Sequence, residues 1–192
     1  MRILSIFILS LSILITAPAY SAWKLDSSKS SLTFVSIKKG TVAENHRFKK
    51  FSGGINHKGI ANISIDLNSV DTSITIRDQR MAEHLFETAK FAQASFSVQL
   101  NENEIDAIAS GSSKNMTLKG RLDLHGLQQA LTVNVVVMKL SETNMVVTTQ
   151  EPVIIKAEDF ALVAGINKLK SLAHLPSIAY SVPVSFVLTF TE

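Results

Sequence analysis

The chain has 192 residues, no cysteine and a formal charge of +3, which becomes +2 once Arg2 is removed with the leader described below. This charge is small and its lysines are scattered, so the composition excludes a nucleic-acid-binding surface. Without cysteine there are no disulfides, thiolate zinc sites, cysteine nucleophiles or lipid-modified thiols. The length favours one domain.

Residues 1–19 have the features of a signal peptide. Arg2 precedes an apolar run over 3–15, and Ala17-Pro18-Ala19 matches an A-x-A cleavage site, with cleavage expected before Tyr20 or as late as residue 22. The run is shorter than the roughly 20 residues that a membrane-spanning helix needs. The sequence therefore predicts export of a mature domain over 20–192 without a retained anchor.

The mature chain is dominated by alternation of apolar and polar residues, the period of a half-buried strand. The predicted strands cover 32–37, 48–56, 63–67, 96–100, 105–109, 116–124, 131–137, 145–157 and 178–190. So many strands in one domain form either a sandwich or a barrel, and the long last strand favours the barrel. The expected fold is all-β: a single antiparallel barrel of eight strands or slightly more, with one or two short helices near a barrel mouth.

One helix is predicted over 76–89. Thr75 is its expected N-cap, and Asp78, three residues later, completes a capping box. Its apolar stripe contains Met81, Ala82, Leu85, Phe86 and Ala89. In a barrel protein, such a helix is expected to cover one mouth.

Two residues of this helix are candidates to contact a ligand's polar head. Arg77 stands one turn before the apolar stripe, where it could point to the mouth, lie over the apolar face, or pair with a carboxylate such as Asp71. His84 is placed either at the mouth or on the surface, and Arg80 is expected to face solvent. A catalytic role for Asp78 is not expected, because the helix cap explains it.

No motif indicates catalysis or metal binding. The five histidines lack ligand spacing, and there is neither a nucleophile elbow nor a phosphate-binding loop. His125 precedes Gly126 at an expected turn. We therefore predict no catalytic residues, no metal and no cofactor.

Several motifs together resemble one known family. They are Trp23-x-Leu25-Asp26, Ser31-x-Thr33-Phe34, Phe48-x-x-Phe51-x-Gly53, the stretch 69–96 with Arg77-Asp78-x-x-Met81, Gly120-x-Leu122-x-Leu124-His125-Gly126 and Pro176-Ser177-Ile178. This pattern resembles the YceI-like family of lipocalin-like, polyisoprenoid-binding periplasmic proteins. One departure is the stretch 159–169, whose apolar spacing suggests a second small helix where many relatives have a short turn.

The resemblance implies a periplasmic carrier or reservoir whose barrel holds an isoprenoid quinone or a prenyl phosphate, with the polar head near an opening. Transient contact with a membrane surface is also implied, and the oligomeric state is left open. The residues expected to line the cavity are Phe34, Phe48, Phe51, Met81, Leu85, Phe86, Phe91, Phe96, Phe186 and Leu188.

Two alternatives share some of these features. An outer-membrane β-barrel also has alternating strands, but one tryptophan and two tyrosines are too few for its aromatic girdles. The other alternative is an enzyme that acts inside the barrel on a lipid head group, but no sequence motif supports it.

Overall fold

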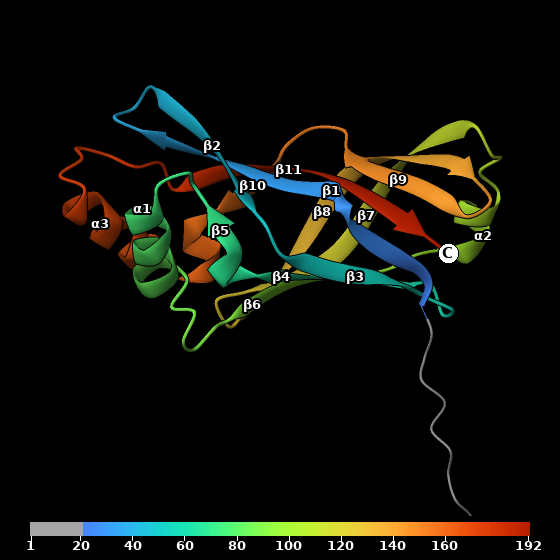
Figure 1. The fold of residues 1–192 in the computed structure, drawn as a ribbon, viewed down its shortest axis with the longest axis horizontal. Helices are drawn as coiled ribbons and strands as arrows, with labels where there is room; N and C mark the ends of the chain where they lie inside the picture. The colour runs from blue at the N-terminus through green and yellow to red at the C-terminus, as the bar shows by residue number, and fades with distance from the viewer. Residues whose placement is uncertain (1–20) are drawn as a thin grey trace, which may run out of the picture.

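The computed structural model describes residues 21–192, so the expected leader lies outside the described residues. Within this range the strands form one continuous antiparallel sheet, and the helices are short (Figure 1). The strands are β1 (Ser21–Lys38), β2 (Val42–Phe48), β3 (Phe51–Asn56), β4 (Ile60–Asp66), β5 (Val70–Asp71), β6 (Gln93–Gln99), β7 (Ser112–Leu124), β8 (Leu127–Ser141), β9 (Asn144–Thr149), β10 (Val153–Lys156) and β11 (Ser181–Thr191). The helices are α1 (Thr75–Arg80), a π-helix η2 (Met81–Leu85), α2 (Glu102–Asp106), α3 (Val163–Leu172) and two single 3-10 turns, η1 (Leu67–Ser69) and η3 (Ala157–Phe160).

The sheet closes on itself. Its neighbours follow the order β1, β3, β4, β6, β7, β8, β9, β11, and β11 pairs back to β1, from Lys24↔Thr191 to Phe34↔Val184. This ring is the predicted eight-stranded lipocalin-like barrel. Closure leaves none of these eight strands as an open edge over the paired length. The short strands β2, β5 and β10 extend the sheet outside the ring.

The β7–β8 hairpin shows how the sequence builds the barrel wall. Both strands turn apolar residues to the interior, namely Met116, Leu118, Leu122, Leu124, Leu131, Val133 and Val137, and the register holds from Ser112↔Lys139 to Leu124↔Leu127. The two-residue turn is His125-Gly126, with φ of +55° and +75°. Positive φ at both positions is typical of the type I′ turn, which suits the twist of paired strands. The turn predicted at His125 is therefore confirmed.

Three strand predictions need correction. The segments predicted as single strands over 48–56 and 145–157 are each divided in two, β2 with β3 and β9 with β10. The first break lets Phe48 and Phe51, three residues apart, both face the interior, which an unbroken strand cannot do. The last strand begins at Ser181, and Ile178 makes only an isolated bridge to Lys38.

The predicted strand over 105–109 is wrong, because its first residues belong to helix α2 and the rest to a turn. Ile105 and Ile108 are both buried, at 8% and 4% exposure. Their three-residue spacing places them on one side of a helical turn, and the run is too short for periodicity alone to separate helix from strand.

The predicted mouth helix is present but differs in two ways. It runs as α1 followed by the π-helix and ends at Leu85, so Ala89 lies in a turn. Thr75 is not the N-cap; Ile74 occupies that position without a side-chain cap. Instead, Asp78 accepts hydrogen bonds from the backbone N–H and the hydroxyl of Thr72, at 2.8 and 2.5 Å. The carboxylate therefore ties α1 to the loop before it.

The helices gather at the two ends of the barrel (Figure 1). Helices α1 and α3 lie at one end, at the left of the view, and α2 lies at the other. Helix α3 packs against the π-helix. It confirms the second small helix predicted from 159–169. We call the end with α1, the π-helix and α3 the helical end.

Candidate functional site

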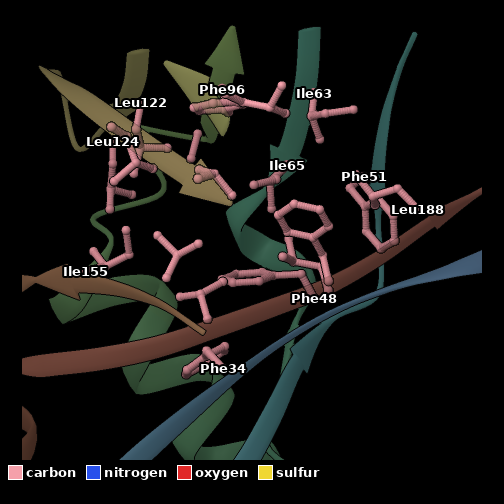
Figure 2. Close-up of a pocket in the computed structure, with 18 of the residues that line it drawn as sticks. Phe34, Phe48, Phe51, Ile63, Ile65, Phe96, Leu122, Leu124, Ile155 and Leu188 are labelled. Carbon is pink, nitrogen blue, oxygen red and sulfur yellow. The ribbon is translucent and has the colours of Figure 1, made fainter. Parts of the chain in front are cut away.

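The barrel encloses a cavity of about 250 Å³ whose walls are entirely apolar. Native cores leave few voids larger than a water molecule, so a space of this size is not ordinary packing. Figure 2 shows side chains from opposite walls converging on it, among them Phe34 from β1, Phe96 from β6 and Leu122 from β7. None of the 36 lining residues carries a polar side chain. The cavity therefore suits a hydrocarbon and offers no hydrogen-bonding partner to a polar guest.

Nine of the ten residues expected to line the cavity do so. They are Phe34, Phe48, Phe51, Met81, Leu85, Phe86, Phe96, Phe186 and Leu188. Three of the phenylalanines form a connected group, because the rings of Phe34 and Phe48 lie 5.4 Å apart and those of Phe48 and Phe86 lie 5.9 Å apart.

Phe91 is the exception and lies outside the cavity lining. Its ring packs against that of His125 at 4.5 Å, and the Lys90 ammonium lies 4.7 Å from its centroid. His125 is itself held by Glu87, 2.8 Å from Nε2, and by the Phe160 carbonyl, 3.2 Å from Nδ1. Phe91 thus supports the β7–β8 turn.

The helical end covers the cavity with apolar side chains from two helices. Met81 and Leu85 of the π-helix face the interior, as does Ile166 of α3. The two helices approach closely at Gly165, where a Cβ atom would come within 2.6 Å of the His84 carbonyl oxygen. The π-helix is consistent with a site here, because single π turns inside helices are frequent at functional sites. At the opposite end, Ile105 of α2 lines the cavity.

Arg77 does not line the cavity but belongs to a polar cluster beside it. Its Nη1 donates to Glu44 at 2.9 Å and its Nη2 donates to the Thr72 carbonyl at 2.7 Å. Its carboxylate partner is therefore Glu44; Asp71 pairs with Arg47 and Lys49 instead. Arg80, expected in solvent, is half-buried and donates to a backbone carbonyl of α3 at 3.3 Å.

His84 also lies outside the cavity lining. It is partly exposed, and its Nε2 is 3.7 Å from the exposed Glu83 carboxylate. Its backbone, rather than its ring, makes the contact with α3.

His46 is a buried polar residue that the sequence did not single out. It is 4% exposed, its Nε2 lies 2.8 Å from the Ser36 hydroxyl, and its ring lies 5.1 Å from that of Phe34. Burial lowers the pKa of His46, and the Arg77 charge lowers it further. The only signal in the sequence was its position two residues before Phe48, which places both on one face of a strand.

Seven polar residues around His46 and Arg77 form what we call the hairpin cluster, because most of them lie on the β1–β2 hairpin. Its members are Ser36, Lys38, Glu44, His46, Thr72, Arg77 and Asp78. The Lys38 hydrogen bond, with help from Arg77, holds the pKa of Glu44 below its usual range. The Glu44 carboxylate is therefore ionised and bridges the two cations.

Other site chemistry is sparse in the described chain. Among the side chains that the structure describes, no three from histidine, aspartate or glutamate come together as a metal site. No helix in this range combines the length and the apolar character needed to cross a membrane.

Comparison with solved structures found matches over most of the chain. A polyisoprenoid-binding domain from Saccharophagus degradans, implicated in plant cell wall breakdown, is 42% identical, with 90% of this chain and 99% of that chain covered and a TM-score of 0.88. BcnA of Burkholderia cenocepacia is 24% identical, with coverage of 86% and 98% and a TM-score of 0.67. The YceI protein of Campylobacter jejuni is 13% identical, with coverage of 77% and 84% and a TM-score of 0.56. The last two show the fold alone.

Comparison with sequences agrees. A search of curated protein sequences found no match. The sequence profile of the YceI-like domain, however, matches residues 23–190, which is almost the entire described chain. With the eight-stranded barrel and the apolar cavity, this match shows that the chain belongs to the family of YceI-like domains.

Proposed function

We propose that this protein is an exported carrier or reservoir for an isoprenoid lipid, whose prenyl chain lies inside the barrel. The observation that carries the proposal is the cavity inside the barrel, whose lining is apolar throughout. The Saccharophagus degradans domain, described as polyisoprenoid-binding, supports an isoprenoid as the kind of ligand.

The energetics favour a long hydrocarbon. Burial contributes about 0.8 kcal/mol for each CH₂-sized group, so one isoprene unit contributes several kcal/mol. A cavity that takes even a few units competes with a membrane for the chain. A sugar or nucleotide would instead lose its hydrogen bonds to water and find no partner in the walls.

The wall pattern also separates this proposal from the outer-membrane alternative. Transmembrane barrels turn apolar residues outward to lipid and polar residues inward. Here β7 and β8 do the reverse, with Leu118, Leu122 and Val133 inward and Lys119, Arg121 and Thr132 outward.

Export is proposed from the sequence alone. The signal peptide predicted over 1–19 would deliver the barrel to the periplasm. There the protein would hold a lipid that water does not dissolve, and transient contact with a membrane surface would load or unload it.

Access is proposed at the helical end. The π-helix and α3 contribute Met81, Leu85 and Ile166 to the cavity wall, so movement of these two helices away from the barrel would uncover the prenyl chain. The head of the lipid, a quinone or a prenyl phosphate, would then lie at the same end.

The test has two parts. The protein is purified from the periplasm without detergent and extracted with organic solvent, and we expect mass spectrometry to find a prenyl lipid at a stoichiometry near one. The delipidated protein is then mixed with a prenyl lipid. At a ligand concentration about a hundredfold above Kd, the expected gain is about 2.7 kcal/mol. For a domain of this size, that gain raises the melting temperature by about 5–11 °C. Absence of lipid in the extract together with no thermal shift would refute the proposal.

A further inference from the structure

Resting on the proposed carrier function, we infer that the hairpin cluster is the head-group site and that it selects an uncharged, oxygen-bearing head, such as a quinone carbonyl, over a phosphate. The cluster lies beside the cavity, contains two buried polar atoms without partners, and has balanced charges.

The position follows from strand alternation. Phe34 of β1 and Phe48 of β2 line the cavity, and side chains two residues away on the same strands point to the same side. Ser36 and His46 occupy those positions and lie nearer the hairpin tip. The His46 ring contacts the Phe34 ring at 5.1 Å. The apolar wall therefore ends where the polar cluster begins, and a prenyl chain that leaves the cavity here places its head in the cluster.

Two polar atoms of this cluster have no hydrogen-bond partner. They are Nδ1 of His46 and Nε of Arg77, both inaccessible to solvent. Glu44, which pairs with Arg77, stands two residues before His46 on β2, so their side chains share one face of the strand. Nearly all buried polar groups in proteins are hydrogen-bonded, and one left unpaired costs about 1–3 kcal/mol. Because the Arg77 Nε–H can only donate, it needs an acceptor, and a ligand carbonyl oxygen would supply one once the side chains that cover Nε move aside.

The charges in the cluster cancel. Lys38 and Arg77 are positive, Glu44 and Asp78 are negative, and the lowered pKa of His46 keeps its ring neutral at neutral pH. Glu44 already neutralises Arg77 at 2.9 Å. A phosphate would bring an uncompensated negative charge into this partly buried site, which is costly, whereas a quinone carbonyl brings none.

The experiment compares three probes with the same chain length: the menaquinone with a geranylgeranyl tail, geranylgeranyl diphosphate, and the headless hydrocarbon phytane. Their dissociation constants for the delipidated protein are measured by displacement of a fluorescent prenyl analogue. We expect the menaquinone to bind about tenfold more tightly than phytane, the equivalent of about one hydrogen bond to a charged group. We expect the diphosphate to bind no more tightly than phytane.

Two variants locate the contact. Arg77→Lys keeps a cation opposite Glu44 but removes Nε, and His46→Phe keeps a ring of similar size without nitrogen. Each is expected to weaken menaquinone binding by about tenfold and to leave phytane binding unchanged. The matched control is Arg47→Lys, next to His46 on β2, where Arg47 forms an exposed ion pair with Asp71. This variant should change neither menaquinone binding nor phytane binding.

An infrared spectrum supplies a readout that a purely structural role would not move. Hydrogen bonding from Arg77 should lower the stretching frequency of one menaquinone carbonyl in the wild-type complex, and the shift should be lost in Arg77→Lys. The ratio of menaquinone to phytane affinity within each variant remains informative even if a substitution lowers stability.

The outcomes separate the two proposals. If none of the three probes binds, the carrier function itself fails. If all three bind equally, or the diphosphate binds most tightly, or the carbonyl band is unshifted in wild type, the carrier function stands and the head-group site is overturned.

Discussion

Replacement of Gly165 by alanine tests whether the π-helix and α3 are held together by close backbone contact. A Cβ atom at this position would lie 2.6 Å from the His84 carbonyl oxygen and 2.8 Å from the Leu85 Cα. Both atoms belong to the backbone of the π-helix, so neither can rotate away. The helices must separate to admit the methyl group.

Two effects oppose each other in Gly165→Ala. Helix propensity alone favours alanine over glycine by about 1 kcal/mol in a helix interior. Overpacking costs about 1–3 kcal/mol, and contact with fixed backbone places this site in the upper half of that range. We therefore expect a net loss of about 1–2 kcal/mol in the free energy of unfolding. For a domain of this size the melting temperature should fall by about 2–8 °C.

The assay is denaturant unfolding of the delipidated protein, with the thermal midpoint as a second measure. Ala164→Gly is the matched control, because Ala164 is exposed on the same helix and should lose about 1 kcal/mol through propensity alone. A bound prenyl lipid should also dissociate faster from Gly165→Ala, since Ile166 and Leu85 line the cavity on either side of the contact. A rise in stability for Gly165→Ala would refute the reasoning, because it would show that propensity outweighs the contact.

Three further predictions follow from the same geometry. Ala61 on β4 points into the cavity, so Ala61→Phe should weaken prenyl-lipid binding by about tenfold in the displacement assay. Asn62, its neighbour, is exposed, and Asn62→Phe should leave the affinity unchanged. Equal affinities of the two variants would contradict the cavity assignment. Because the pKa of His46 is lowered from 6.5, the unfolded chain binds a proton that the folded chain does not, so the free energy of unfolding should fall as pH drops below about 6.5 towards the folded pKa. His46→Phe should remove that part of the pH dependence in urea titrations, and unchanged curves would exclude His46 as its source. Gly126→Ala should lower the free energy of unfolding by at least about 1 kcal/mol more than Gly111→Ala in thermal unfolding. Both glycines have positive φ, but only at Gly126 would the added methyl group meet a phenylalanine ring, at 2.7 Å. Equal losses would show that the ring moves aside.

Strand prediction succeeded for the alternating runs of the β7–β8 hairpin and failed for the short run over 105–109. The alternation over 116–124 and 131–137 extends across β7 and β8, whose pairing then fixes thirteen residue pairs in one register. The run over 105–109 fits both a strand and a helical turn, and only its position at the end of the barrel made it α2.

The cavity residues were predicted better than the polar site. Apolar residues on inward faces of a closed barrel must meet in its centre, so nine of ten were placed correctly. Phe91 was not, because its spacing from Phe86 and Phe96 is uniform in the sequence while the chain turns between them. Glu44 and Arg77 are separated by 33 positions, and no local sequence pattern predicts their ion pair.

The sequence by itself determined the fold class, the family and the apolar character of the barrel interior, because alternation and turn residues act locally and repeat along the chain. The tertiary structure alone decided that the strands close around an unfilled space, that Gly165 joins two helices over it, that His46 packs against Phe34, and that Arg77 pairs with Glu44. The reason is physical: closure, voids and long-range ion pairs depend on distances between residues far apart in the sequence, and those distances exist only once the chain has folded.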